Sequence, residues 1–472
     1  MAKATGRNHM NVIGSLRARI LDSIKPTDEE IKLATYRAND IIARLKAVAP
    51  KDVEIITAGS VARGTQVRGS YDIDIFLLFP KSRDERKMEA MGLKIAQKIV
   101  NKKKGESFII KYAEHPYVKV LFDGGEISAD IVPAFRIRTA AEMGSAVDRT
   151  PLHNEFVNKH LNERQKDDVR ILKAFLKNHQ IYGAEAQVHG FSGYLCELMI
   201  SNYGSFNGVI GRFADLKLPL IIDVGNKAEI DPKSAEGTAL IKQFKTDFIF
   251  IDPTDVNRNV AASLSKSSAA RFVILAKALM KKADMKTFSG AKYSTIISRD
   301  AVIGLHKSMG LDVYLLALES DDIADDIIWE QLVKLKGRIC TMLAKNGFPP
   351  VLALQNASKS SCIIAFFMNR TNLGSVPLGG PSAFMGGSAN AFFKAHKASF
   401  GFFLYDDKLI SIEKPRHVSA ESLLRGLKRD PNFIMPSHIK TAGSFFYSNN
   451  DIPEDYAKML YEAFESARIK HF

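Results

Sequence analysis

Two aspartates two positions apart, Asp72 and Asp74, are the pair in this chain best placed to do chemistry. They stand in Asp-Ile-Asp-Ile, inside a β-type run from Tyr71 to Phe79. Side chains on a strand alternate between faces, so both carboxylates point to one side and the isoleucines to the other. Adjacent carboxylates repel each other, and a divalent cation such as Mg²⁺ relieves that repulsion through hard oxygen ligands. Asp-x-Asp also occurs by chance, so this interpretation needs support from other residues.

A small-residue turn upstream gives that support. Gly59 and Ser60 follow a strand-like run, Val53 to Thr57, and Gly64 permits a tight backbone. Backbone N–H groups and a hydroxyl there can hold a phosphate chain, with Arg63 adding charge. The chain contains no Walker A motif and no Gly-x-Gly-x-x-Gly, so a P-loop or a dinucleotide fold is not indicated.

A third carboxylate, Asp130, stands in the otherwise apolar strand-like run from Ile127 to Phe135. A lone charge in such a strand is costly unless it is paired or bound to a metal. The alternative is an aspartate on an edge strand that faces water.

Together these residues resemble a known superfamily. Gly-Ser-x-x-Arg-Gly-Thr, then Asp-Ile-Asp-Ile, then a distant aspartate is similar to the polymerase-β-type nucleotidyltransferases. Four further motifs resemble the archaeal, class I CCA-adding enzymes. Together with the nucleotidyltransferase motif they span residues 59 to 265. They are Arg-Thr-Pro-Leu-His153, the run around Lys173 and Tyr182, Gly-Phe-Ser-Gly-Tyr-Leu-Cys-Glu at 190 to 197, and Asp-Pro-Thr-Asp-Val-Asn-Arg258. Beyond residue 290 the resemblance rests on overall layout and on Phe-Met-Gly-Gly at 384 to 387.

The resemblance implies a tRNA nucleotidyltransferase, which uses CTP and ATP without a nucleic-acid template to build or repair the 3′-terminal CCA of tRNA and releases pyrophosphate. It implies a two-metal Mg²⁺ site at the catalytic carboxylates Asp72, Asp74 and Asp130. It also implies nucleotide-binding roles for Gly59, Ser60, Arg63, His153, Lys173, Tyr182 and Arg258, the last reading the base. Lys173 on a solvated helix face and His153 as a structural histidine are the alternatives.

The expected fold is multidomain α+β, and its division follows the resemblance. A nucleotidyltransferase head with a mixed sheet covers residues 1–152, and a helical, nucleotide-binding neck covers 153–282. A mixed α/β body (283–312 and 392–472) and a tail (313–391) bind tRNA, and the protein is expected to form a homodimer. Within this plan, Thr27 and Glu30 form a capping box for a helix to Val48. Residues 154–178 are expected to form one helix and 374–388 a long loop.

Composition agrees with a nucleic-acid enzyme. The chain has 472 residues, with 66 Lys and Arg against 52 Asp and Glu, so its net charge is 66 − 52 = +14. Such a basic chain favours a polyanionic partner, here tRNA through its acceptor and T arms. A hydrophobic fraction of 46% excludes wholesale disorder, and three cysteines exclude a disulfide framework. No apolar run approaches the ~18 residues of a membrane span, so no membrane association is expected, and the polar N-terminus favours the cytoplasm.

Two other functions stay open on the sequence alone. A poly(A) polymerase or another terminal nucleotidyltransferase shares the three carboxylates. A non-catalytic RNA-binding protein on the same fold is the second alternative, although it gains nothing from crowding three carboxylates. Six phenylalanines could stack on RNA, but core packing is the expected explanation for most of them; they are Phe384, Phe392, Phe393, Phe400, Phe402 and Phe403.

Overall fold

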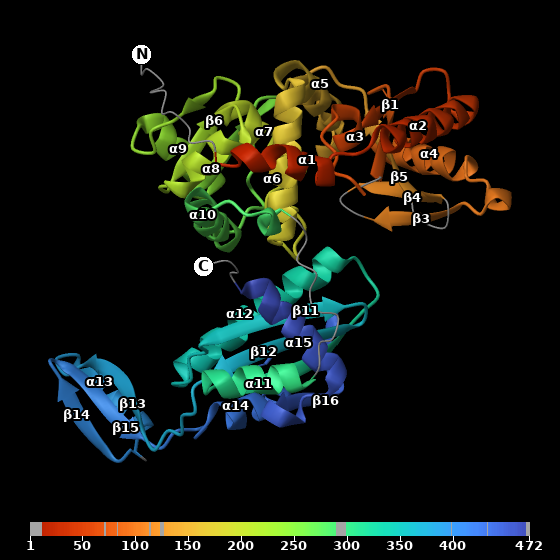
Figure 1. Cartoon of the computed structure of the whole chain (residues 1–472). Coiled ribbons are helices and arrows are strands. Elements are labelled where there is room, and N and C mark those ends of the chain that lie inside the picture. The colour runs from red at the N-terminus through yellow and green to blue at the C-terminus, as the bar shows by residue number, and fades with distance from the viewer. Residues whose placement is uncertain are drawn as a thin grey trace. The chain divides into compact units, whose positions relative to one another are not determined.

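The computed structural model describes residues 12–69, 72–82, 84–112, 115–122, 127–288, 299–397, 399–431 and 433–468. It divides into two compact units, one up to residue 292 and the other from 293 to 470 (Figure 1). Among the described residues, no helix combines the length and the apolar character that crossing a membrane requires.

The first unit begins with a five-stranded mixed sheet in the order β1-β2-β5-β4-β3. Its strands are β1 (Glu54–Ala58), β2 (Asp72–Phe79), β3 (Ser107–Tyr112), β4 (Pro116–Phe122) and β5 (Ile127–Phe135). The β2–β5 pair is parallel and the other pairs are antiparallel. Two helices, α2 (Asp28–Val48) and α4 (Glu85–Lys98), pack their apolar residues against one face. The expected capping box of Thr27 and Glu30 opens α2. The mixed sheet of the expected head is confirmed.

Alternation along β2 separates its apolar and acidic side chains. Ile73 and Ile75 are buried in the core beneath α2 and α4. On the opposite face Phe76 and Leu78 pack in a smaller apolar cluster. Asp72 and Asp74 share that second face at the beginning of the strand, as the alternation predicts.

The remainder of the first unit is mainly helical. Its helices are α1 (Arg17–Ile24), α3 (Gly59–Arg63), α5 (Thr150–His160), α6 (Glu163–Asn178), α7 (Gly193–Tyr203), α8 (Phe206–Ala214), α9 (Ala235–Phe244) and α10 (Lys266–Lys281). A small sheet in the order β7-β6-β8-β9 joins them, with strands Ala228–Glu229, Leu220–Asp223, Phe248–Asp252 and Asp255–Asn259. Helix α6 is buried along most of its length, and Phe175 packs edge-on against Phe206 and Phe272.

The expected single helix over residues 154–178 is wrong, because two helices occupy that range. Asn162 lies between α5 and α6 and accepts a hydrogen bond from the backbone of Gln165, which makes it the N-cap of α6. A capping asparagine stops one helix and starts the next. The expected boundary at 152/153 falls inside α5.

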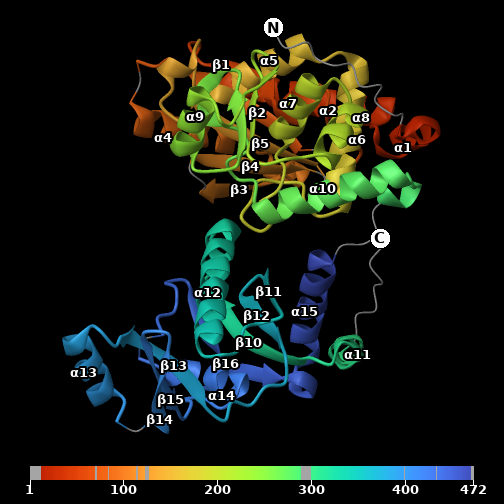
Figure 2. The same cartoon turned by 90° about the vertical axis from the view of Figure 1, so that its left-hand side faces the viewer.

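The second unit is built on an antiparallel sheet in the order β11-β12-β10-β16. Its strands are Leu352–Ser358, Ser361–Met368, Asp312–Ser320 and Ile439–Ser448. Helices α12 (Asp325–Lys345) and α14 (Ala420–Gly426) pack on one face, and α15 (Glu454–Ala467) packs on the other (Figure 2). Helix α11 (Arg299–Met309) contacts α15.

A smaller sheet, β13-β15-β14, follows with helix α13. Its elements are β13 (Val376–Ser382), α13 (Gly386–Ala395), β14 (Gly401–Tyr405) and β15 (Lys408–Glu413). The loop expected over 374–388 is therefore wrong, because β13 gains long-range backbone pairing that its Gly and Ser content does not reveal. The expectation that core packing explains most of the six phenylalanines is wrong, because five of them are exposed: Phe384, Phe393, Phe400, Phe402 and Phe403.

These sheets do not follow the expected body and tail ranges. Strands β10 to β12, expected in the tail, share a sheet with β16, expected in the body. The boundary at 391/392 falls inside α13. Pairing between strands more than a hundred residues apart sets this arrangement, and sequence pattern does not encode it locally.

Candidate active site

Parallel pairing of β2 with β5 brings the three aspartates together. Asp74 is the direct partner of Asp130, and Asp72 is the partner of Ser128. The Ser128 hydroxyl donates a hydrogen bond of 2.8 Å to Asp72 Oδ1. Burial, together with the nearby charge of Asp130, raises the pKa of Asp74 to about 6. Asp72 and Asp74 thus share one face of the sheet, as expected. Asp130 lies on the inner strand β5, so the alternative of a water-facing aspartate on an edge strand is wrong.

A lysine that sequence reasoning missed stands among these carboxylates. Lys119 on β4 is the direct partner of Asp130 across the sheet. Its Nζ lies 3.3 Å from Asp72 Oδ1 and 3.3 Å from Asp130 Oδ1. Tyr117, two residues earlier, lies near the same group: burial raises its pKa, and the charge of Asp130 adds to the effect. Alternation along β4 places both residues on one face, but only the long-range strand order shows which face that is.

The donor set fits a hard divalent cation. Three carboxylates face one ammonium group, and carboxylate oxygen is the ligand that Mg²⁺-type ions prefer. Asp130 Oδ1 is buried, and its cationic neighbour is the Lys119 ammonium group 3.3 Å away. A buried carboxylate oxygen needs a cation to offset its lost hydration, and a metal ion can fill the same role.

Gly59 brings the upstream turn against this group. It opens α3 with a φ of +68°, and a Cβ built on it would lie 1.7 Å from Asp74 Oδ2. No side chain fits between the backbone and that carboxylate, so only glycine permits the approach. Ser60 follows in the same turn, and its carbonyl accepts a hydrogen bond from the Thr65 N–H. Gly64 ends α3 in the left-handed conformation.

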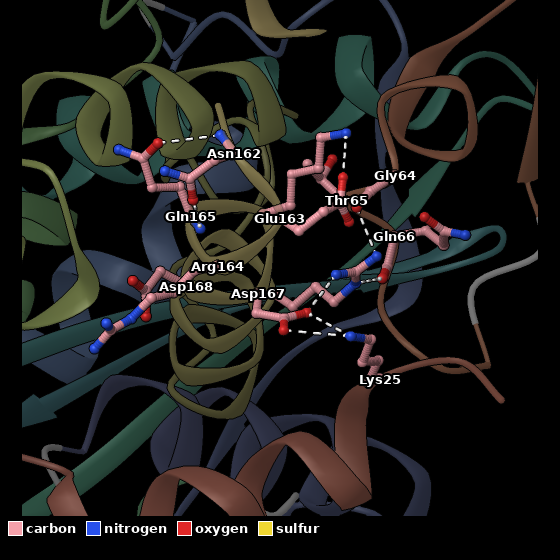
Figure 3. A network of polar contacts seen from close by, with 12 residues as sticks. Lys25, Gly64, Thr65, Gln66, Asn162, Glu163, Arg164, Gln165, Asp167 and Asp168 are labelled. Carbon is pink, nitrogen blue, oxygen red and sulfur yellow. Dashed lines mark hydrogen bonds and ion pairs between the residues drawn. The ribbon is translucent and has the colours of Figure 1, made fainter. Parts of the chain in front are cut away.

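The segment after α3 is fastened to helix α6. Arg170 donates hydrogen bonds of 2.6 Å to the Gly64 carbonyl and 3.0 Å to the Gln66 carbonyl. Asp167 pairs with Arg170 at 2.6 Å and with Lys25 at 3.1 Å. Figure 3 shows Gly64, Thr65 and Gln66 beside α6, with Asp167 directed toward Lys25. These contacts fix Thr65 beside the buried cluster described next.

Two of the expected phosphate-binding cations belong to a buried ionic cluster around Glu197. Glu197 has no exposed side-chain area, and it lies 2.9 Å from Arg63 Nε and 3.3 Å from Lys173 Nζ. Burial opposes ionisation of Glu197, but the charges of Lys173 and Arg63 lower its pKa. Lys173 also donates to the Thr65 carbonyl, and its own pKa is lowered by burial. Lys173 is therefore not on a solvated helix face, and sequence reasoning missed Glu197.

Two more of the expected residues, His153 and Arg258, meet at Asp252. Its Oδ2 lies 3.0 Å from His153 Nε2 and accepts a bond of 2.8 Å from Arg258. Tyr194 donates to Oδ1 and stacks on the His153 ring at 3.9 Å. Burial lowers the pKa of His153, against the opposite effect of Asp252. Asp252 is the hub of this cluster, although the sequence motif alone assigned it no role.

Arg63 and Asn154 connect these groups. Asn154, next to His153, accepts a 2.8 Å hydrogen bond from Arg63 and donates one of 3.2 Å to the Thr57 carbonyl. The charge of Arg63 partly opposes the rise in the pKa of Asp74 that burial and Asp130 cause. Tyr182 lies close by: its hydroxyl is 3.0 Å from a Cβ built on Gly193. Lys177 Nζ stands 5.1 Å from the Tyr182 ring centroid, and it too was missed.

A glycine turn pressed against Asp74, one of three neighbouring aspartates on a mixed sheet, defines a nucleotidyltransferase. Residues 38–153 match the family model of the nucleotidyltransferase domain. Residues 167–289 match the model of the tRNA nucleotidyltransferase second domain, and residues 309–442 match that of the CCA-adding enzyme C-terminal domain.

Relatives with curated functions agree. A CCA-adding enzyme of Methanocaldococcus jannaschii is 38% identical over 71% of this chain and 73% of its own length. One of Methanosarcina acetivorans is 34% identical over 71% and 70%. One of Methanothermobacter thermautotrophicus is 32% identical over 89% and 90%. The chain belongs to the family of archaeal CCA-adding enzymes, and the resemblance seen in the sequence is confirmed. It is a tRNA nucleotidyltransferase that uses nucleotide substrates and a divalent cation, and the comparisons do not favour a poly(A) polymerase.

Proposed function

We propose that this protein builds and repairs the 3′-terminal CCA of tRNA at one active site, with CTP and ATP as substrates and Mg²⁺ as the cation. The observation that carries the proposal is the placing of Asp74 directly opposite Asp130, with Gly59 against the Asp74 carboxylate. That arrangement offers carboxylate ligands and a backbone turn for phosphate within one small region.

Asp72, Asp74 and Asp130 would hold the metal. Two bound Mg²⁺ ions would lower the pKa of the attacking primer hydroxyl and stabilise the departing pyrophosphate. Asp130 is the proposed carboxylate nearest that hydroxyl. The raised pKa of Asp74, caused by burial and by Asp130, shows how unfavourable the paired charges are without such a cation.

The remaining residues would bind the nucleotide. Gly59 and Ser60 present backbone and hydroxyl groups to the triphosphate, and Arg63 and Lys173 supply positive charge from the Glu197 cluster. His153 and Tyr182 would line the sugar and phosphates. Arg258 would read the base: one nitrogen bonds Asp252, and its side chain is 31% exposed, so its fork of donors can face a ligand.

The first unit is the proposed catalytic and nucleotide-binding part, and the second unit is proposed to hold the acceptor and T arms of tRNA. A homodimer in the cytoplasm is the proposed state of the protein. Light scattering coupled to size-exclusion chromatography tests it: twice the 52.3 kDa chain mass supports the dimer, and a single chain mass contradicts it.

The decisive experiment is nucleotide incorporation on tRNA that ends at its discriminator base, with each single nucleotide and with CTP plus ATP. Ordered addition of C, C and A that requires Mg²⁺ supports the proposal, whereas repeated A addition favours a poly(A) polymerase.

Asp74→Asn should lower turnover by orders of magnitude, because metal catalysis supplies several kcal/mol. Asp322→Asn, an exposed aspartate of the second unit, is the matched control. Undiminished turnover in the folded Asp74→Asn protein contradicts the assignment.

A further inference from the structure

Lys119 occupies the position that a cation needs at this site. Its ammonium group lies 3.3 Å from Asp72 Oδ1 and 3.3 Å from Asp130 Oδ1, so it bridges two carboxylates from different strands. Its side chain is 26% exposed, and it projects from an inner strand of the sheet. A lysine placed in this way neutralises part of the repulsion that would otherwise separate Asp72 from Asp130.

The aspartates are not gathered as tightly as metal ligands. In the described part of the chain, one set of three carboxylate or imidazole side chains has ligand atoms within 4.8 Å of one another, and that set is Glu85, Glu89 and His115, away from the aspartates. A Mg²⁺ ion requires ligand oxygens at about 2.1 Å, and therefore requires them to converge. An ammonium group between Asp72 and Asp130 opposes that convergence, because it repels the divalent ion at short range.

We propose that Lys119 is a resident counter-cation of the catalytic aspartates. It holds Asp72 and Asp130 in the metal-free protein, competes with the divalent ion for their oxygens, and gives them up when the ion binds. Lys119 is thus a positioning residue that lowers metal affinity and keeps the acidic face of the sheet stable without metal. This inference rests on the proposed function, since it takes the three aspartates as the metal ligands.

Two other roles for the lysine predict different results. A lysine that only stabilises the sheet changes the melting temperature equally with and without metal and leaves metal affinity unchanged. A lysine that only attracts the triphosphate changes nucleotide affinity and leaves the affinity for metal alone unchanged. Metal binding in the absence of nucleotide therefore separates the proposal from both.

The test is a titration of the full chain with Mn²⁺ alone, followed by electron paramagnetic resonance of the unbound ion. Lys119→Met removes the charge and keeps the length of the side chain. It should tighten Mn²⁺ binding about tenfold, since one unit charge is removed at contact distance. Lys119→Arg keeps the positive charge beside the carboxylates and should stay within about twofold of the wild type. Lys111→Met is the matched control: this exposed lysine on the neighbouring strand β3 acts on Asp130 through space, so its removal should change binding by less than about threefold.

Thermal melts provide the second readout. Lys119→Met should melt below the wild type in EDTA, and saturating Mg²⁺ should narrow or remove the difference. Equal or weaker Mn²⁺ binding by Lys119→Met overturns the inference. If Asp74→Asn binds Mn²⁺ as tightly as the wild type, the metal-site assignment in the proposed function fails instead.

Discussion

Gly59 shows how one residue type can determine an active site. The turn that it begins passes so close to Asp74 that a single added carbon would overlap a carboxylate oxygen, at 1.7 Å. Its φ of +68° adds a second reason for glycine, because other L-residues are strained there. Space and conformation thus act together at the point where the turn proposed to bind phosphate meets the proposed metal ligand Asp74.

Gly59→Ala should lower kcat by about a hundredfold, because displacing Asp74 by an ångström misaligns the reacting groups. Backbone strain should also lower stability by about 1–2 kcal/mol. Gly105→Ala is the control: Gly105 has a φ of +74° with nothing within 4 Å of its built Cβ. It should lose similar stability and keep full turnover. Nucleotide incorporation and urea denaturation measure the two effects, and equal turnover in both variants would refute the steric argument.

Helices α6 and α7 are joined by buried charge as well as by apolar packing. Glu197 on α7 faces Lys173 on α6 and Arg63 on α3, and all three side chains are less than 10% exposed. Burying such ions costs several kcal/mol for each, and only mutual attraction and hydrogen bonds offset that cost. The cluster therefore fixes the three helices relative to one another and holds Arg63 where its charge acts on Asp74.

Glu197→Gln should destabilise the protein by about 3–5 kcal/mol, because it leaves two buried cations without their counter-charge. Glu229→Gln removes a carboxylate whose side chain is 49% exposed and pairs with Arg212. That change should cost less than about 1 kcal/mol. Urea denaturation of both variants gives the comparison. Equal losses would show that the buried cluster contributes no more than a surface ion pair.

The stability that Glu197 provides should depend on pH in the acid range. Its folded pKa is lowered by Lys173 and Arg63 against burial, from an ordinary value of 4.5. A carboxyl group with a lowered folded pKa stabilises the protein above its unfolded pKa, and this contribution is lost as pH falls. The difference in unfolding free energy between wild type and Glu197→Gln should therefore shrink below about pH 4.5; a constant difference down to pH 3 contradicts the argument.

The local sequence pattern predicts individual helices and strands better than it predicts which of them pack or pair together. Alternation placed Asp72 and Asp74 on one face of a strand, and a capping box located the start of α2. Lys119 and Glu197 were missed because each gains its meaning from contacts with distant strands or helices. The sequence pattern predicts one helix over 154–178 where two occur, because one capping asparagine between apolar repeats is a weak signal. The body sheet was divided wrongly because β10 and β16 pair across more than a hundred residues.

At the scale of the whole molecule, the charge of +14 determines how tRNA is attracted. Neutralised phosphates release counterions, so binding that relies on Lys and Arg weakens steeply as salt rises. The exposed phenylalanines of the small sheet, Phe400 and Phe403, add a surface on which unpaired bases can stack. Neither contribution depends on the anticodon.

Affinity for tRNA should therefore fall by at least about tenfold between 50 and 200 mM salt. A minihelix that carries only the acceptor and T arms should be nearly as good a substrate as whole tRNA. Fluorescence anisotropy over a salt series and incorporation on the minihelix measure the two effects. Binding that is flat across salt, or activity lost on the minihelix, counts against the electrostatic account.

One active site should add both C and A. The sequence contains one Asp-x-Asp pair, Asp72 and Asp74, and in the structure Asp74 is the direct strand partner of one further aspartate, Asp130. The Glu85, Glu89 and His115 cluster has no Gly-Ser turn on its own segments and offers no second polymerising centre. Choice of base must then come from a pocket whose hydrogen-bonding partners change as the primer grows, with Arg258 offering donors to cytosine.

Asp130→Ala should lower two activities by orders of magnitude, because both need the same metal ligand. They are CMP addition to tRNA ending at the discriminator base and AMP addition to tRNA ending in CC. Asp322→Ala, which alters an exposed aspartate, should leave both additions intact. If Asp130→Ala protein retains either addition alone, a second site exists and the single-site mechanism is wrong.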